Sequence, residues 1–316
     1  MNYVATFIIL VFCINLYFII ARHFKIIDNP NERSSHSIGT FTGGGIVFPI
    51  VLVCWLLNDN FGYLNFFWGL SLIAIISFFD DLYNVRQFYR LFFHIMSVSF
   101  LFFQLNIFLL PSWLSIFIFV IVIGWINAFN FMDGINAISV FYAGTSLFTF
   151  YLLQDLVNQR LIIEYMGIAL IVFGYFNVRN NSIVFLGDVG SISIAFVLAF
   201  LMINLIYQTS RWEYIMFFSV YGIDTILTII QRIYKKENIF KPHRHHLYQY
   251  LVDKKKHSHL MVSAAFSIFQ LFINIILLYL IIPNNHSSLI SCFLLILLVT
   301  IYVLIKFKYI KIIQDI

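Results

Sequence analysis

Charged residues are scarce in this chain of 316 residues: they make up 10% of it, whereas a soluble domain carries about 25%. Hydrophobic residues make up 61%, and the mean hydropathy is +0.92. These values exclude a soluble globular protein. Gly and Pro are also few, at 14 and 5, while Phe and Tyr number 38 and 18. That composition excludes a disordered or collagen-like chain and leaves a polytopic membrane protein.

The chain has only three cysteines, Cys13, Cys54 and Cys292, and each lies within an apolar stretch. They show neither the CxxC spacing of a zinc site nor the even count of a disulfide framework. We therefore interpret them as small core residues. The net charge is +5. It is not evidence for a nucleic-acid partner, because basic residues in a membrane protein mainly set its orientation in the membrane.

Long apolar stretches predict an all-α polytopic integral membrane protein with about 11 transmembrane helices, since about 20 apolar residues cross a bilayer. Residues 1–316 then form a single transmembrane catalytic domain. The expected spans are residues 3–21, 44–57, 61–79, 91–110, 113–127, 137–153, 161–176, 191–207, 213–230, 260–282 and 288–305.

The distribution of basic residues predicts the orientation of the chain. The connections after odd-numbered spans, together with the C-terminal tail, hold 17 of the 19 Lys and Arg residues. The positive-inside rule therefore places the N-terminus outside and the C-terminus in the cytoplasm. The expected cytoplasmic connections are residues 22–43, 80–90, 128–136, 177–190 and 231–259.

Five polar clusters interrupt the apolar sequence, and all of them follow odd-numbered spans. They lie at residues 28–45, 80–90, 127–136, 185–191 and 243–249, with Asp224 ahead of the last. Because they share one expected side of the membrane, they predict one site on the cytoplasmic face.

The acidic residues of these clusters suggest a hard-cation site. Asp80 and Asp81 are adjacent and repel each other unless they share a cation or a proton. Asp133 and Asp188 lie at the same expected depth, and Asn127 and Asn130 add neutral oxygen ligands. Carboxylates and amides without a thiolate favour Mg²⁺ or Mn²⁺ over Zn²⁺. The alternatives are a solvated helix end for the aspartate pair and helix caps for Asp133 and Asp188.

The remaining clusters suggest anion binding. Gly43 to Gly45, with Gly44 at the centre, and the run from Gly187 to Ser191 each begin an apolar helix, where bare amides suit a phosphate; the alternative is close helix packing. His243, His245 and His246 suit a diphosphate, or form a solvated loop attracted to lipid headgroups. Arg86 and Arg90 hold a lipid phosphate or are ordinary interfacial cations.

Taken together, the clusters resemble the polyprenyl-phosphate N-acetylhexosamine-1-phosphate transferase superfamily, of the glycosyltransferase family 4 type. Its Arg-Ser-Ser-His segment before a Gly pair matches residues 33–36 and 43–45, and its paired aspartates match Asp80 and Asp81. Its Asn-x-x-Asn-x-x-Asp-Gly signature matches residues 127–134, and its Phe-(Met/Leu)-Gly-Asp-x-Gly-Ser signature matches residues 185–191. Its Asp-Thr before a histidine-rich connection matches Asp224, Thr225 and residues 243–246.

The resemblance implies roles for these residues. Asp80 and Asp81 would be catalytic, with Asp80 deprotonating or orienting the lipid phosphate. Asn130 and Asp188 would hold the metal. The remaining matched or neighbouring positions would bind substrate: His36, Gly44, Arg90, Asn127, Asp133, Gly187, Asp224, His243, His245 and His246.

The chain also departs from the superfamily pattern. Asn136 and Ala137 stand where a second Asp-Gly is common, so a carboxylate role is not carried over there. Phe41 replaces a frequent Pro, and Ile183 replaces a frequent basic residue. The form of residues 246–249 resembles the branch that starts O-antigen or related surface glycans, within lipopolysaccharide and cell wall biogenesis, more than the peptidoglycan-precursor translocase.

The implied reaction transfers a sugar 1-phosphate from a UDP-sugar to undecaprenyl phosphate and releases UMP, in one displacement or through an aspartyl-phosphate. The resemblance implies a multi-pass protein of the bacterial inner membrane, with UDP-sugar, undecaprenyl phosphate and membrane lipids as partners. UDP-GlcNAc is the expected donor and a 6-deoxy sugar nucleotide the alternative. The sequence does not determine the oligomeric state, and a homodimer is one possibility. Two other functions were weighed: a transporter or lipid flippase with intramembrane ion sites, and an inactive scaffold for glycan assembly.

Overall fold

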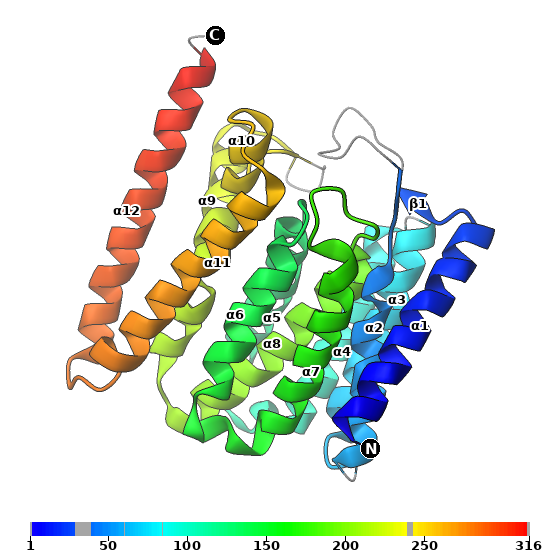
Figure 1. Cartoon of the computed structure of the whole chain (residues 1–316). Coiled ribbons are helices and arrows are strands. Elements are labelled where there is room, and N and C mark those ends of the chain that lie inside the picture. Colours follow the sequence, from blue (N-terminus) through cyan, green and yellow to red (C-terminus); the bar gives the residue numbers. More distant parts are fainter. Residues whose placement is uncertain (1, 29–38, 60, 84, 239–242, 315–316) are drawn as a thin grey trace.

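The computed structural model describes residues 2–28, 39–59, 61–83, 85–238 and 243–314. Its described part is a bundle of α-helices joined by short turns (Figure 1). The α-helices are α1 Tyr3–His23, α2 Val47–Asn58, α3 Leu64–Tyr83, α4 Gln87–Gln104, α5 Ser112–Met132, α6 Ile138–Tyr151, α7 Arg160–Asn177, α8 Gly187–Thr209, α9 Ser219–Tyr234, α10 Leu247–Asp253, α11 His259–Ile276 and α12 Ser287–Gln314.

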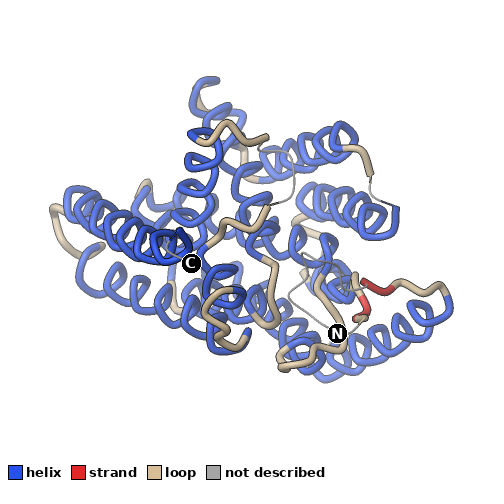
Figure 2. Tube along the Cα trace, turned by 90° about the horizontal axis from the view of Figure 1, so that it is seen from above, coloured by secondary structure: helices blue, strands red, loops and turns tan. Residues whose placement is uncertain are grey.

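Shorter elements extend or link these helices. Short 3₁₀ segments precede α2, α5, α7 and α9, and a π-helical turn continues α11. They are η1 Gly44–Ile46, η2 Ile107–Leu109, η3 Gln154–Gln159, η4 Trp212–Phe218 and η5 Leu277–Ile281. Two strands of two residues, β1 Ile27–Asp28 and β2 Thr40–Phe41, pair antiparallel at one edge of the bundle (Figure 2).

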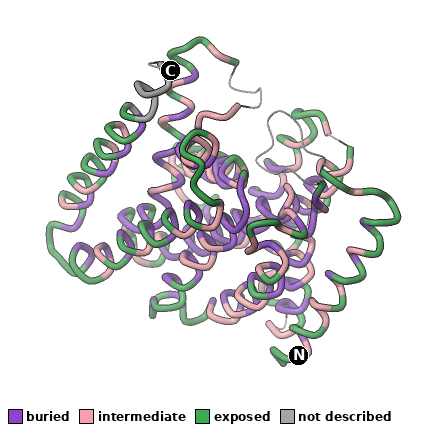
Figure 3. Tube along the Cα trace, turned by 45° about the horizontal axis from the view of Figure 1, so that its top comes forward, coloured by how far each residue is buried: buried purple, intermediate pink, exposed green. Residues whose placement is uncertain are grey.

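The core of the bundle is α8. Every residue from Val189 to Leu205 is buried, and α8 packs against α2, α3, α5 and α6. Figure 3 shows buried residues concentrated in the middle of the molecule and exposed ones on the outer helices. A helix that is apolar on all sides can be surrounded by protein or by lipid, and here protein surrounds α8. The large side chains of Phe66, Phe196 and Phe200 fill the interface between α3 and α8.

Among the described residues, eight helical segments are long and apolar enough to cross a membrane. The all-α polytopic class is therefore confirmed, whereas the count of eleven is not. Helices do form at all eleven expected stretches, but α2 and α6 have only 12 and 14 residues. The remaining difference is α4, which carries polar residues such as Arg90 and His94.

The helices extend beyond the apolar stretches into the expected connections. α3 continues to Tyr83, α4 already begins at Gln87, α5 continues to Met132 and α8 begins at Gly187. The expected connections 80–90, 128–136 and 177–190 are therefore too long, because hydropathy detects only the apolar part of a helix and not its polar ends. As a result, Asp80, Asp81, Arg90 and Asp188 lie on helix ends rather than in loops.

The two ends of the chain lie at opposite ends of the bundle (Figure 1). The polar ends of α3 and α8, the two strands and α10 gather at the end where α12 finishes. Which end faces the cytoplasm stays a prediction from the charge distribution.

Candidate functional site

The site begins with Asp81, which caps the central helix. Its Oδ1 accepts a hydrogen bond from the backbone N–H of Asp188 at 2.8 Å, and its Oδ2 accepts one from Val189 at 3.1 Å. The first N–H groups of a helix have no partner within it, and the positive end of the helix dipole favours a carboxylate. Asp81 thereby fixes the end of α3 against the start of α8.

Arg90 joins the other two carboxylates of the cluster. Its guanidinium lies 2.5 Å from Asp80 Oδ2 and 3.0 Å from Asp188 Oδ2, and all three side chains are partly exposed. Asp80 also accepts a hydrogen bond from the N–H of Val85 at 2.6 Å. Arg90 lies in the first turn of α4, so one side chain ties the adjoining ends of α3, α4 and α8. The cluster thus holds three carboxyl groups, those of Asp80, Asp81 and Asp188, and one guanidinium.

Asn130 reaches the same place from α5. The hydroxyl of Ser191, one turn along α8 from Asp188, donates to Asn130 Oδ1 at 2.6 Å. The amide nitrogen of Asn127 donates to the carbonyl of Ile123 in its own helix at 2.8 Å. The structure therefore places Asn130 against the first turns of α8, which carry Asp188. That the two residues hold a metal stays a prediction.

The glycine segments pack against each other. The N–H groups of Gly44 and Gly45 donate to the carbonyls of Phe185 and Leu186 at 3.1 and 2.9 Å. A Cβ on Gly187, whose φ is +72°, would lie 2.6 Å from Asp81 Oδ2. Because the amides have acceptors within the protein, the structure favours the close-packing alternative for these glycines over the expected phosphate cradle.

The histidine group forms a second part of the site. The ring centroid of His243 lies 5.7 Å from that of His245 and 5.0 Å from that of His246. Burial lowers the pKa of His243 to about 4 and also lowers the pKa of His245. These two imidazoles are therefore neutral at pH 7. His245 Nε2 lies 3.2 Å from Glu237 Oε2 and its Nδ1 lies 3.3 Å from the Tyr250 hydroxyl. His243 Nδ1, in contrast, has no hydrogen-bond partner among the described residues and is left for a ligand.

Asp224, expected to bind substrate, lies beneath the histidines with no exposed surface. Its carboxylate accepts hydrogen bonds from the N–H of Leu247 at 3.0 Å and faces His246 Nδ1 at 3.1 Å. Since both oxygens are occupied within the fold, the geometry gives Asp224 a positioning role instead of direct contact with a ligand.

Tyr248 connects the histidine group to the rest of the site. Its hydroxyl donates to the carbonyl of Phe131 at 3.0 Å. A Cβ on Gly134 would lie 2.1 Å from the same hydroxyl oxygen, so a larger residue there would have to displace the Tyr248 ring. The connection between α5 and α6, which carries Asp133, is thus held against the histidine segment.

We expect Asp133 to make the stability of the protein fall as pH rises from about 4 to 7. Burial, with a smaller contribution from the charge of Asp188, raises the pKa of Asp133 to about 7 from an ordinary value of 3.8. The folded state therefore binds more protons than the unfolded state in this interval, and ionisation on raising the pH destabilises it. Thermal unfolding of wild type and Asp133→Asn at pH 5, 6, 7 and 8 measures this effect.

The Asn variant carries no titrating carboxyl, so its Tm should vary less over this range than that of wild type. Equal slopes for the two proteins would contradict the assignment. Asp253→Asn is the matched control, since Asp253 pairs with Arg244 at 2.9 Å on the polar side of α10.

His36 lies outside the described residues. Of the other predicted positions, the structure brings Asp80, Asp81, Arg90, Asn130 and Asp188 into one cluster. The histidines and Asp224 form a neighbouring group.

Comparison with known proteins shows what this arrangement is similar to. A model of glycosyl transferase family 4 matches residues 63–206, which include the carboxylate cluster. A phospho-N-acetylmuramoyl-pentapeptide-transferase of Lactococcus lactis subsp. cremoris is 28% identical over 257 residues, covering 68% of this chain and 75% of the relative. An undecaprenyl-phosphate alpha-N-acetylglucosaminyl 1-phosphate transferase of Thermotoga maritima is 22% identical over 264 residues, covering 81% of this chain and 84% of the relative.

The chain belongs to the polyprenyl-phosphate N-acetylhexosamine-1-phosphate transferase superfamily. A further relative, the phospho-N-acetylmuramoyl-pentapeptide-transferase of Streptococcus mutans serotype c, is 31% identical over 162 residues, or 46% of this chain and 47% of the relative. These names do not support the O-antigen and lipopolysaccharide role expected from residues 246–249, nor a transporter. They include a peptidoglycan-type enzyme, the branch the sequence disfavoured.

Two residues that contribute to the histidine group lie in none of the polar clusters of the sequence. Tyr302 and Lys306 of α12 are buried and reach the Asp224 network. The available signal was an ionisable residue at the edge of an apolar span, because such residues are rare in membranes unless they have a partner. Asn136, where the superfamily often has Asp, donates to the carbonyls of Arg179 and Asn180 at 2.9 and 3.0 Å.

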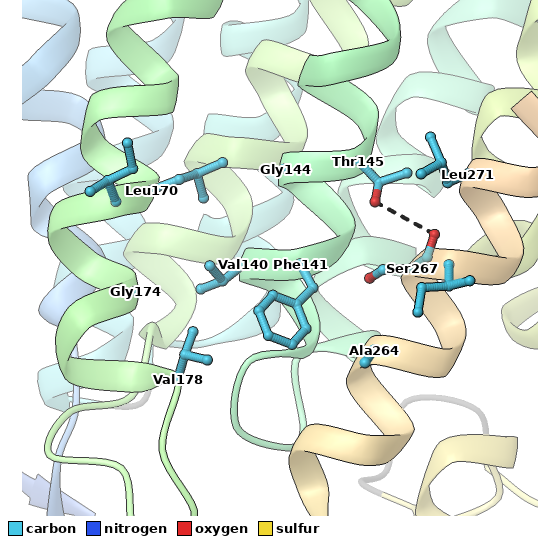
Figure 4. Close-up of a pocket in the computed structure, with 12 residues that line it drawn as sticks. Val140, Phe141, Gly144, Thr145, Leu170, Gly174, Val178, Ala264, Ser267 and Leu271 are labelled. Carbon is cyan, nitrogen blue, oxygen red and sulfur yellow. Dashed lines mark hydrogen bonds between the residues drawn. The ribbon is translucent and has the colours of Figure 1, made fainter. Parts of the chain in front are cut away.

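One apolar cavity of about 510 Å³ lies elsewhere in the transferase, between α6, α7 and α11 (Figure 4). Gly144, Leu170, Gly174 and Leu271 are among its lining residues, and none of the predicted site residues lines it. The polar site therefore does not coincide with this cavity.

Proposed function

We propose that the protein transfers an N-acetylhexosamine 1-phosphate from a UDP-sugar to undecaprenyl phosphate and releases UMP. The observation that carries the proposal is the Asp80–Arg90–Asp188 bridge at the adjoining ends of α3, α4 and α8. It lies in the segment matched by the family model. The named relatives transfer phospho-N-acetylmuramoyl-pentapeptide or N-acetylglucosaminyl 1-phosphate groups, which supports an N-acetylated sugar.

The chemistry needs alignment more than activation. The attacking group is a phosphate oxygen, which is already ionised at neutral pH, so the protein has to bring two anions together and offset their repulsion. Arg90 is the cation at the centre of the cluster. Asp80, which is paired with that cation, would accept the last proton of the lipid phosphate or orient it.

The donor set of the site fits Mg²⁺ or Mn²⁺. Asp188 and Asn130 supply hard oxygen ligands from α8 and α5, and the three carboxylates leave an excess of negative charge around Arg90. Within the described ranges, no group of three or more His, Cys, Asp or Glu residues forms a complete cation cage. That suits Mg²⁺, which proteins hold with one or two carboxylates and substrate phosphates. When bound, the ion would offset charge that develops on the donor's diphosphate.

The histidine group would then bind the donor. Neutral His243 offers a ring nitrogen that has no partner among the described residues, and Tyr248 holds the histidine group next to the connection carrying Asp133. We place this site at the cytoplasmic leaflet, because UDP-sugars are cytoplasmic and the charge distribution favours that side.

The test is an assay of the purified full-length protein in detergent with undecaprenyl phosphate, Mg²⁺ and single donors. The donors are UDP-GlcNAc, UDP-MurNAc-pentapeptide and a 6-deoxy UDP-sugar. We expect UMP release and a lipid-linked product with one N-acetylated donor, and neither product when lipid is omitted or EDTA is added. Folded protein that releases no UMP with any of these donors would contradict the proposal.

A further inference from the structure

The last helix, α12, is apolar and mostly exposed, but one strip of it is polar and buried. Only 17% of its membrane-spanning window is buried, and it packs on α9 at the edge of the bundle (Figure 1). Tyr302 and Lys306, one turn apart, are 9% and 5% exposed. Lys308, two residues further, is exposed. The Lys306 ammonium thus points into the protein although a lipid-headgroup position is available nearby on the same helix.

A continuous set of hydrogen bonds runs from this strip to the histidine group. Lys306 Nζ donates to Thr228 Oγ1 at 2.8 Å, and the Thr228 hydroxyl donates to Asp224 Oδ1 at 3.2 Å. The Tyr302 hydroxyl also donates to Asp224 Oδ1, at 2.7 Å. Asp224 in turn faces His246 Nδ1 at 3.1 Å. Thr228 and Asp224 have no exposed surface.

The Asp224 carboxylate determines which nitrogen of the His246 ring carries a proton. An imidazole nitrogen facing a carboxylate carries the proton, so Nδ1 is the donor to Asp224 and Nε2 is the nitrogen left for a ligand. His246 Nε2 is buried and has no hydrogen-bond partner in the part of the chain that the structure describes. Its ring lies 5.0 Å from that of His243, in the group expected to bind the donor.

We propose that α12 positions His246, with Tyr302 and Lys306 fixing the Asp224 carboxylate so that the imidazole presents Nε2 to the UDP-sugar. Tyr302 and Lys306 are positioning residues, since neither reaches the histidine directly. They lie outside the segment that the family model matches. This inference rests on the proposed function for its substrate, but its geometry can be tested separately.

Three substitutions break the network at different points with little change in shape. They are Lys306→Met, Tyr302→Phe and Thr228→Val, where Val matches Thr in size but has no hydroxyl. The matched controls are Lys308→Met, Tyr279→Phe on an exposed surface, and Thr228→Ser, which restores the hydroxyl.

We expect each of the three to lower kcat/KM for the UDP-sugar by about tenfold, as is usual for residues in one hydrogen-bond network. The KM for undecaprenyl phosphate should stay unchanged, and all three controls should resemble wild type. Combining Lys306→Met with His246→Gln should cost no more than His246→Gln alone, because Lys306 acts through that ring. A general loss of packing would instead move both KM values and multiply with the histidine substitution.

The ¹⁵N NMR signals of histidine-labelled protein provide a readout that needs no turnover. The His246 signal, assigned by its loss in His246→Gln, should report an Nδ1-protonated ring in wild type and a mixture of tautomers in Lys306→Met and Thr228→Val. An unchanged signal in both variants would overturn the positioning proposal even if the enzyme is active. Absence of UMP release by wild type, with the expected signals, would overturn only the proposed function.

Discussion

Replacing Asp188 with Asn is expected to lower the rate of UMP release by about 100- to 1000-fold, the usual loss when a group that offsets charge in a transition state is removed. Asp188 contributes a carboxylate beside Asn130 and accepts from Arg90 at 3.0 Å. The Asn side chain keeps the size of Asp but removes its charge, so both the metal pair and the Arg90 bridge are weakened.

Asp80→Asn is expected to cause a loss of similar size, because Asp80 is the carboxylate that faces the lipid phosphate in the proposed reaction. Asp155→Asn is the matched control, since Asp155 is exposed and lies in η3, away from the cluster. Rates are measured with saturating Mg²⁺ and donor, and Tm is recorded for each variant. Turnover within about threefold of wild type in Asp188→Asn, at unchanged Tm, would exclude Asp188 from the reaction.

Gly45→Ala is expected to produce the largest loss of stability. A Cβ at this position would lie 2.2 Å from Gly190 Cα and 2.6 Å from the carbonyl oxygen of Leu186. These are backbone atoms, so the contact cannot be relieved by rotating a side chain, and overpacking of this kind costs about 3 kcal/mol or more. We expect a Tm too low for the variant to be purified in a folded state.

Gly124→Ala provides the control for this substitution. Gly124 lies within α5, and a Cβ there meets nothing within 4 Å among the described residues. Ala is the better helix former, so its Tm should equal or exceed that of wild type. A Gly45→Ala protein with normal Tm and size-exclusion profile would show that the contact between η1 and the start of α8 is not needed for folding.

The carboxylate cluster shows how far sequence reasoning reaches. The sequence identifies Asp80 and Asp188 as candidate site residues, because ionisable residues are costly in a membrane and are therefore rare next to apolar spans. Their common partner, Arg90, was expected to bind substrate, but spacing along the chain does not pair it with both aspartates. That pairing depends on how α3, α4 and α8 meet, which is set by side chains such as Phe66 and Phe196 packed deep in the bundle.

The capping role of Asp81 and the packing role of the glycines were decided by the tertiary structure. A glycine before a helix can expose its amides to a phosphate or can allow another backbone to approach, and both uses leave the same pattern in the sequence. Here the amides of Gly44 and Gly45 meet the segment before α8, 141 residues away along the chain. Rules that use only neighbouring residues cannot predict a contact between segments so far apart in the sequence.

The sequence by itself determined the membrane class, the helical positions and the membership of the superfamily, because each follows from composition, apolar length or short motifs read along the chain. Only the tertiary structure decided which polar residues face one another. The buried strip of Tyr302 and Lys306 illustrates the reason. Tyr302 contacts Asp224 and Lys306 contacts Thr228, each 78 positions away along the chain. Such contacts are selected by the packing of α12 on α9, which hydropathy and motif spacing do not encode.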